Sequence, residues 1–191
     1  DSKIDKQFSK GEKEIPILNP ISSDLDVIRR SIFSNLAIHL KKNQDRGYED
    51  LSLFEIGPTF FGKNPGEQQI VVGGLKSGKV NRKSWLDKER NIDVFDIKSD
   101  TIKTLVELGI EEKNLYVTDN TKHSYHPGRS GSVTFKSEKG PHLAYFGEIH
   151  PAITKNLDFK DKNIFGFEIF LKNIPEPNKK IRQTKKSFQA S

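Results

Sequence analysis

The sequence predicts an α+β fold in which an antiparallel sheet is flanked by helices. Several apolar segments of strand length follow one another and are joined mainly by short, turn-rich connections, whereas segments with a helical period are sparse. A doubly wound α/β fold would instead place a helix after nearly every strand. With 191 residues, the chain is long enough for one good-sized domain or two small ones.

The N-terminal part of the chain predicts a short helix followed by a strand. Residues 1–8 are compatible with a helix, and residues 10–14 form a charged turn. Residues 15–18 have the composition of a strand. Pro16 places that strand near an edge or an end of a sheet, because proline has no N–H to donate to the ladder.

The clearest helical pattern extends from about residue 31 to about residue 46. Its apolar side chains recur with the 3.6-residue period of a single buried stripe, and they are Ile32, Phe33, Leu36, Ala37 and Leu40. Lys42 and Arg46 lie in the last turns, where positive charge suits the carbonyl end of the helix dipole. Gly47 can supply the left-handed residue that ends the helix.

The next two apolar segments predict a pair of buried antiparallel strands. Residues 51–56 are mostly apolar on both faces, which is typical of a strand covered on both sides. We expect Gly57-Pro58 to end this strand. Residues 69–75 form the second strand, and its glycines at 73 and 74 lack the spacing of a phosphate loop. Close packing of neighbouring backbone is therefore the better explanation for them.

Residues 93–97 alternate between polar and apolar side chains, which predicts another strand. A helix capped by Ser99 or Asp100 then follows and ends at Gly109. The carboxylates of Asp93, Asp96 and Asp100 do not predict a magnesium site. Strand alternation would point Asp93 and Asp96 to opposite faces, and capping accounts for Asp100.

The C-terminal half predicts further strands and one short helix. The strands are residues 115–117, 132–135 and 142–148. The turn at 137–140 joins the last two as a hairpin. Pro151 opens a helix that extends to residue 157, in the first position that proline favours, and His150 is its cap or a packing residue. Residues 164–171 close the sheet as one more buried strand.

Composition indicates a cytoplasmic protein without a membrane partner. Hydrophobic residues make up 33% and charged residues 30% of the chain, and no apolar run approaches the ~20 residues that span a bilayer. The N-terminus shows no signal-peptide pattern. The absence of cysteine excludes disulfides, thiolate metal sites and a cysteine nucleophile. The absence of methionine favours a piece of a longer chain, unless modified methionines are missing from the sequence.

The net charge of +6 is concentrated in the last twenty residues. Residues 172–191 carry six basic side chains and one acidic side chain, which gives +5 in that segment. We interpret residues 1–175 as one nearly neutral module and residues 176–191 as a basic linker toward a missing anticodon-binding domain. The charge therefore does not require RNA binding by the module itself.

Short segments spread over nearly the whole chain resemble the beta subunits of bacterial phenylalanyl-tRNA synthetases. In the family's order they are NPISSDLDVIRRS, NQDRG, LFEIGPTF, VGGLKSG, DVFDIKSD, HPGRSG, FGEIHP and FEIFL. The resemblance is to the module that imitates a class II synthetase core, and it implies that fold. It also implies a heterotetramer of two alpha and two beta subunits that joins phenylalanine to tRNA with ATP and magnesium. In that family the alpha subunit holds the active site.

The resemblance further implies that the module is noncatalytic. In active class II synthetases a strand ends in Phe-Arg-x-Glu, and the arginine holds the ATP α-phosphate. Here Phe61 stands at the arginine position and Lys63 at the glutamate position. The third class II motif needs closely spaced glycines and an arginine, and residues 166–170 offer one glycine and no arginine. We therefore expect no catalytic, cofactor-binding or metal-binding residue, and a scaffold that packs against the alpha subunit and helps to place tRNA.

Contacts with the alpha subunit or tRNA are expected on the 31–46 helix and on a loop at 123–131. The candidate residues are Phe33, Leu36, Arg46, His126 and Arg129. His123 and His126 with Arg129 also suggest a metal pair or an anion clamp. Two histidines three residues apart, without a nearby carboxylate or thiolate, are however a weak zinc signal.

Two other residues, Ser130 and Trp85, and two other functions have alternative interpretations in the same sequence. Ser130 lies one residue short of the spacing of a serine hydrolase elbow, and Trp85 is more typical of a packing anchor than of a nucleobase platform. An autonomous ATP-dependent ligase would need Arg29, Arg30 or Arg46 to bind phosphate. A free-standing RNA-binding module would keep its tRNA affinity after removal of residues 172–191.

Overall fold

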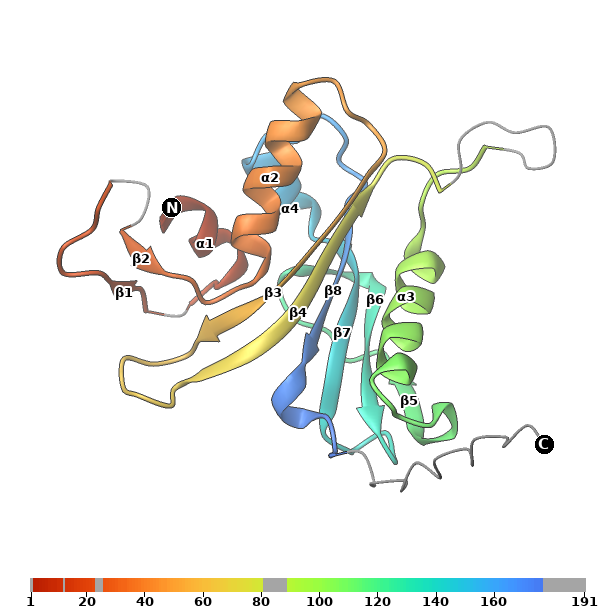
Figure 1. Ribbon diagram of the computed structural model, residues 1–191. Coiled ribbons are helices and arrows are strands. Elements are labelled where there is room, and N and C mark those ends of the chain that lie inside the picture. Colours follow the sequence, from red (N-terminus) through yellow and green to blue (C-terminus); the bar gives the residue numbers. More distant parts are fainter. Residues whose placement is uncertain (1, 12, 23–25, 81–88, 177–191) are drawn as a thin grey trace, which may run out of the picture.

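An antiparallel sheet of six strands forms the centre of the structure, a computed structural model that describes residues 2–11, 13–22, 26–80 and 89–176 (Figure 1). The strands are β3 (Leu51–Phe60), β4 (Gln68–Ser77), β5 (Leu115–Thr118), β6 (Tyr125–Phe135), β7 (His142–Ile149) and β8 (Phe165–Phe170). Their order is β3-β4-β8-β7-β6-β5, and each neighbouring pair is antiparallel. The predicted α+β fold is confirmed.

Helices cover both faces of this sheet (Figure 1). On one face lie α1 (Ser2–Phe8), α2 (Phe33–Asp45) and α4 (Pro151–Asn156), in a core that includes Val71 of β4. On the other face α3 (Val94–Glu107) packs against β6, β7 and β8, in a core that includes Val72. Val71 and Val72 belong to different cores because successive side chains of a strand point to opposite faces.

Short elements complete the described chain. Beside α1, the strands β1 (Ile15–Pro16) and β2 (Val27–Ile28) form a separate antiparallel pair. The strand predicted at 15–18 is therefore shorter than expected, and β2 was not foreseen. Two 3-10 turns, η1 (Glu112–Asn114) and η2 (Leu171–Asn173), precede β5 and follow β8. Among the described residues, no helix has both the length and the apolar character that crossing a membrane requires.

The predicted helix at 31–46 is confirmed as α2. Ile32 and Phe33 are fully buried, and Arg46 caps the helix before Gly47, whose φ of +89° is left-handed. The helix start lies directly on β4, because a Cβ added at Gly73 would clash with the Cγ2 of Ile32. The glycine at this position therefore permits a close helix–strand approach, although it is a side chain and not the predicted neighbouring backbone that packs against it.

Strand β3 differs from its prediction in two respects. It does not end at Gly57-Pro58 but extends to Phe60, and Pro58 pairs with Ile70 of β4. Proline is tolerated here because β3 is an edge strand, and the N–H of Phe60, two residues on, points outwards to the Arg29 carbonyl (3.1 Å). The strand is also not covered on both faces, since the side chain of Phe54 is 75% exposed.

The strand predicted at 93–97 is wrong, because these residues cap and open α3. The Asp93 carboxylate accepts hydrogen bonds from the N–H groups of Phe95 (2.8 Å) and Asp96 (3.1 Å). The Asp96 carboxylate in turn accepts the N–H of Asp93 (2.9 Å). This capping box satisfies N–H groups that the first helical turn leaves without partners, so the helix begins earlier than Ser99 or Asp100. Its predicted end is confirmed at Gly109, which has a φ of +94°.

The remaining predicted elements are confirmed with small shifts of their ends. Strands β6 and β7 form the expected hairpin, and β8 is buried along its whole length. Pro151 begins α4, and the Nδ1 of His150 caps it by accepting the N–H of Ala152 (3.1 Å). The prediction for Trp85 lies outside the described residues, and so does the predicted linker at 176–191 from its second residue onwards.

Candidate functional site

The end of the β3–β4 hairpin carries the two positions at which the catalytic arginine and glutamate were expected to be missing. Phe61 directly follows β3, and its ring is 52% exposed. Lys63 lies exposed in the connection to β4. The backbone N–H of Phe61 donates to the Glu67 carbonyl (3.0 Å), and the Glu67 carboxylate accepts the N–H of Asn64 (2.8 Å). These bonds close the connection, and the Asn64 N–H holds the pKa of Glu67 below its usual value.

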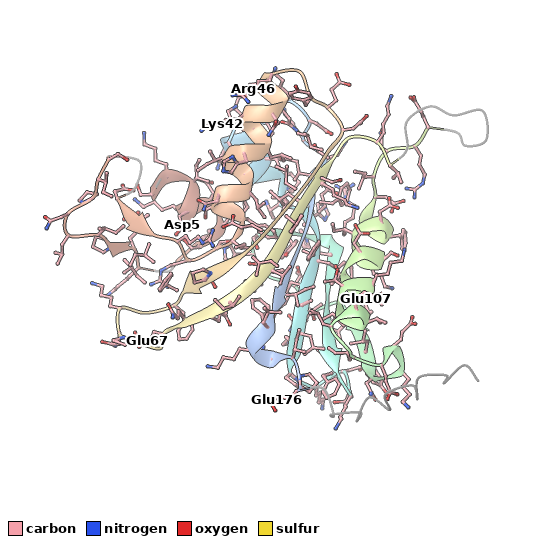
Figure 2. All side chains as sticks on the ribbon, in the orientation of Figure 1. Asp5, Lys42, Arg46, Glu67, Glu107 and Glu176 are labelled. Atoms are coloured by element: carbon pink, nitrogen blue, oxygen red, sulfur yellow. The ribbon has the colours of Figure 1, made fainter. Side chains whose placement is uncertain are left out.

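Two arginines hold the edge of β3 and are not directed at an open phosphate site. The Nε of Arg29 donates to the Pro58 carbonyl (2.9 Å), and its guanidinium pairs with Glu55. A guanidinium of Arg30 donates to the Phe61 carbonyl (3.4 Å). Arg46 lies exposed at the other end of α2, far from the Glu67 connection (Figure 2). The structure therefore does not bring Arg29, Arg30 and Arg46 together.

Phe33 and Leu36 are not on the surface, which corrects their prediction as contact residues. Phe33 is fully buried and packs against Phe8 and Tyr125, with ring centroids 5.7 and 5.8 Å away. Leu36 belongs to the same core. The apolar stripe of α2 thus packs against its own sheet, which is the usual role of such a stripe. Contacts by Arg46, His126 and Arg129, which are not buried, stay predictions.

The segment expected as a loop at 123–131 belongs largely to β6, so that prediction is wrong. A register shift between Tyr125 and Ser130 accommodates Pro127 and Gly128 within the strand. At this bulge the Ser130 hydroxyl lies within hydrogen-bond distance of the His126 carbonyl and of the Thr121 hydroxyl. The sequence could not distinguish this bulge from a turn, because both use proline and glycine.

The candidate metal ligands of this segment point to different partners. The Nδ1 of His126 accepts the N–H of Gly128 (3.0 Å), whereas the Nε2 of His123 lies 2.8 Å from the Phe8 carbonyl. Arg129 pairs with the buried carboxylate of Glu148 (2.6 Å). Within the described ranges, no group of three or more histidine, aspartate or glutamate side chains could hold a metal ion.

The three aspartates near α3 are each engaged within the fold. Asp93 and Asp96 form the capping box, and Asp96 also accepts two hydrogen bonds from Arg90 (both 2.6 Å). The Arg90 guanidinium holds the pKa of Asp96 below its usual value. Asp100 pairs with Lys76 of β4 and does not cap the helix, which corrects its prediction.

Two features of the surface and core were missed by the sequence analysis. The first is an exposed apolar patch, the β3–β4 patch, made of Phe54 (75% exposed), Ile56 (60%) and Ile70 (42%). The second is the ion pair of the buried Glu168 with the partly exposed Lys122. Beside this pair, burial raises the pKa of Tyr125 well above its usual value. The patch is explained by the alternation of side chains between the two faces of β3 and by the place of β3 at the edge of the sheet. Only strand order could reveal that β3 is an edge.

Comparisons with known proteins agree on one family. The family described as "Phenylalanyl tRNA synthetase beta chain CLM domain" matches residues 1–171. The phenylalanine–tRNA ligase beta subunit of Paramagnetospirillum magneticum is 41% identical over 96% of this chain. That of Rhodospirillum rubrum is 40% identical over 95%. The chain spans 23% and 22% of the lengths of these curated relatives.

The fold is similar to that of a solved synthetase with a distant sequence. The structure of Desulfitobacterium hafniense PylSc, a pyrrolysyl tRNA synthetase, superimposes with a TM-score of 0.60 at 13% identity. The superposition covers 90% of this chain and 57% of that one. At this identity the likeness concerns the fold alone.

Proposed function

Because the chain belongs to the family of phenylalanyl-tRNA synthetase beta chains, we propose that it is a noncatalytic module of the ligase that attaches phenylalanine to its tRNA. Its fold is that of a class II synthetase core, as the resemblance implied. In this proposal the module packs against the alpha catalytic subunit and helps to place tRNA. The family match does not support an autonomous ligase or a free-standing RNA-binding module.

The side chain at the end of β3 is the observation that carries the noncatalytic role. A phosphate-binding site needs donors, and the exposed phenyl ring of Phe61 offers none to an ATP α-phosphate. Lys63 reverses the charge of the expected acid, and the adjacent Arg29 is already paired with Glu55. The strand at the third motif, β8, is buried and carries no arginine. ATP and magnesium are therefore assigned to the alpha subunit.

The β3–β4 patch supports the scaffold role. Phe54 and Ile56 are two residues apart on β3, and Ile70 pairs with Pro58, the next position on that face. α3 covers β6, β7 and β8 and leaves these three side chains in water. A contiguous exposed apolar patch is typical of a protein–protein interface. We assign it to the alpha subunit, in place of Phe33 and Leu36.

Arg46, His126 and Arg129 are the proposed polar contacts with tRNA or the partner. Arg46 is exposed, and the Arg129 side chain stays 54% exposed although it pairs with Glu148. A guanidinium in this state can still contact a backbone phosphate. The proposed place of action is the cytoplasm, where tRNA is charged.

Two measurements test the proposal. The chain is co-expressed with the matching alpha subunit, and the size of the purified complex is determined; a stable complex is expected. Phenylalanine-dependent ATP–pyrophosphate exchange is then measured with the chain alone and with the complex. Exchange above background by the chain alone would contradict the noncatalytic role, and failure to co-purify would contradict the scaffold role.

A further inference from the structure

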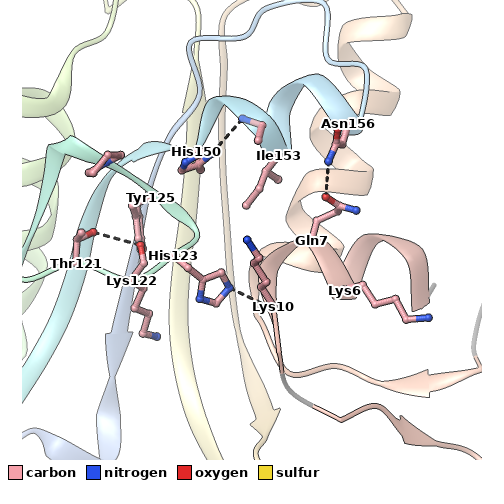
Figure 3. A pocket seen from close by; sticks show the side chains of 12 residues that line it. Lys6, Gln7, Lys10, Thr121, Lys122, His123, Tyr125, His150, Ile153 and Asn156 are labelled. Carbon is pink, nitrogen blue, oxygen red and sulfur yellow. Dashed lines mark hydrogen bonds between the residues drawn. The ribbon is translucent and has the colours of Figure 1, made fainter.

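A cavity of about 650 Å³ lies between α1, α4 and the segment 121–127 (Figure 3). Among the residues that the structure describes, its lining contains three lysines and two histidines and no aspartate or glutamate. The segment 121–127 contacts the end of α1 across the cavity, because the Nε2 of His123 lies 2.8 Å from the Phe8 carbonyl and 3.1 Å from the backbone nitrogen of Lys10. The lining is thus basic and is held by elements far apart in the sequence.

Two polar side chains of this cavity, His150 and Gln7, present hydrogen-bond donors. The Nδ1 of His150 accepts the N–H of Ala152, so in the neutral ring the proton is on Nε2. The Oε1 of Gln7 accepts from the amide of Asn156 (2.9 Å), which leaves the NH₂ of Gln7 as a donor (Figure 3). Donors without acceptors of their own favour an anionic ligand.

Lys10 supplies positive charge that no described residue of the fold neutralises. Of the three lysines, Lys6 pairs with Glu14 and Lys122 pairs with Glu168, each at 3.1 Å. Lys10 makes no ion pair with any residue that the structure describes, and it points into the space between Gln7 and His123 (Figure 3). Its ammonium can therefore bind an anion without first breaking a salt bridge to a described residue.

Among its described lining residues, the cavity offers no exposed phenyl, phenol or indole ring on which a nucleobase could stack. Its phenol ring, Tyr125, is 1% exposed and packs edge-on against Phe33 inside the core. Single-stranded nucleic acid is usually held by exposed aromatic faces together with basic groups. Basic donors without such a face are suited to phosphate and carry no base specificity.

We infer that this cavity binds a backbone phosphate of tRNA, with Lys10, Gln7 and His150 as the donors. The inference rests on the proposed function, and it adds a contact site separate from Arg46, His126 and Arg129. The mouth of the cavity is open to an extended backbone, since Lys10 and Asn156 are exposed. The contact positions the tRNA and contributes no sequence selectivity.

The test uses the complete synthetase, with both subunits, and measures tRNA binding at several salt concentrations. Lys10→Ala is expected to weaken tRNA binding about three- to tenfold near 0.1 M salt. It should also lower the slope of log affinity against log salt by about one, because one phosphate contact is lost. The matched control is Lys13→Ala, an exposed lysine outside the cavity. A second variant, His150→Asn, keeps a capping acceptor for α4 and removes the Nε2 donor.

The outcomes separate this inference from the proposed function. If the alpha and beta subunits do not assemble, the proposed function fails. If they assemble and bind tRNA, but Lys10→Ala and Lys13→Ala have the same affinity and salt slope, the cavity assignment is overturned. Inorganic phosphate is titrated in parallel and followed by imidazole NMR signals. If Lys10→Ala abolishes phosphate binding but leaves the affinity for tRNA unchanged, the assignment of the cavity to RNA is also overturned.

Discussion

The ammonium of Lys122 lies 3.1 Å from the carboxylate of Glu168, whose side chain is only 6% exposed. The same ammonium lies over the rings of Tyr145 and Phe170, 4.7 and 4.5 Å from their centroids. The pair joins the segment before β6 to β8 and supplies the positive charge that a buried carboxylate needs.

Removing Lys122 should therefore destabilise the fold. Lys122→Ala leaves Glu168 buried without its partner, and we expect the free energy of unfolding to fall by about 2–4 kcal/mol. The double variant Lys122→Ala with Glu168→Gln should recover part of this loss, because no charge is then buried alone. Urea denaturation measures both, with Lys103→Ala on the exposed face of α3 as control. A double variant no more stable than the single one would contradict the expectation.

Asp5 joins α1 to the start of α2. Its buried carboxylate accepts hydrogen bonds from the Ser34 hydroxyl (2.7 Å) and the Arg30 N–H (3.1 Å). Asp5→Ala should lower the free energy of unfolding by about 2–3 kcal/mol, because these buried donors lose their acceptor. Hydrogen exchange should show faster opening of α1. The control is Glu107→Ala, which removes an exposed acid at the end of α3 (Figure 2). Equal losses of stability in Asp5→Ala and Glu107→Ala would contradict the role of Asp5.

The lack of a side chain at Gly73 lets the start of α2 pack closely against the sheet. Gly73→Ala should cost about 1–3 kcal/mol, because the new methyl group overlaps Ile32 in a filled core. Ile32→Ala removes the γ-carbons that the new methyl group overlaps, so Gly73→Ala combined with Ile32→Ala should be less destabilised than the sum of the two single variants. The control is Gly128→Ala, where an added Cβ meets His126 at an ordinary distance of 3.7 Å. Thermal melting compares the variants, and a harmless Gly73→Ala would show that α2 is not packed as described.

The Arg90–Asp96 pair predicts a dependence of stability on pH. Arg90 lowers the pKa of Asp96 in the folded state below the ordinary value of 3.8. The stability that this adds is fully present above pH 3.8 and is lost as the pH falls through the folded pKa. Asp96→Asn should therefore be less stable than the parent protein near pH 6, by about 1 kcal/mol or less, because its partner Arg90 is half-exposed and solvent screens the pair. The difference should shrink below pH 3.8, and a constant difference would rule out this linkage.

The β3–β4 patch predicts which exposed phenylalanine matters for assembly. Phe54→Asp places a charge in the proposed interface and should weaken the complex with the alpha subunit by tenfold or more, because a buried unpaired charge is costly. Phe95→Asp is the matched control, since Phe95 is 72% exposed on α3 and lies outside the patch. Co-purification yield and the dissociation constant measure the effect. Equal losses for both variants would assign no special role to the patch.

Local sequence patterns determined most elements of this protein. The apolar period of α2, the glycine after it, the hairpin of β6 and β7, and the proline that opens α4 were each predicted from residues near in sequence. These predictions succeeded because periodicity, capping and turn chemistry act over a few residues. The absence of an arginine at Phe61 and of an acid at Lys63 is likewise a property of the sequence alone.

Only the tertiary structure decided which apolar residues face water and which polar groups meet. Phe33 and Phe54 both belong to apolar segments, yet the first is buried and the second is exposed, because strand order makes β3 an edge and leaves α3 over other strands. The residues around Asp93 alternate in sequence as a strand would, and only the folded backbone shows that they form the capping box of α3. Lys122 and Glu168 are far apart in sequence and form their ion pair only in the folded chain. Lys10 and His150, also far apart in sequence, line one cavity only in the folded chain. Pairing across such distances depends on how the whole sheet is assembled, which no short window of sequence contains.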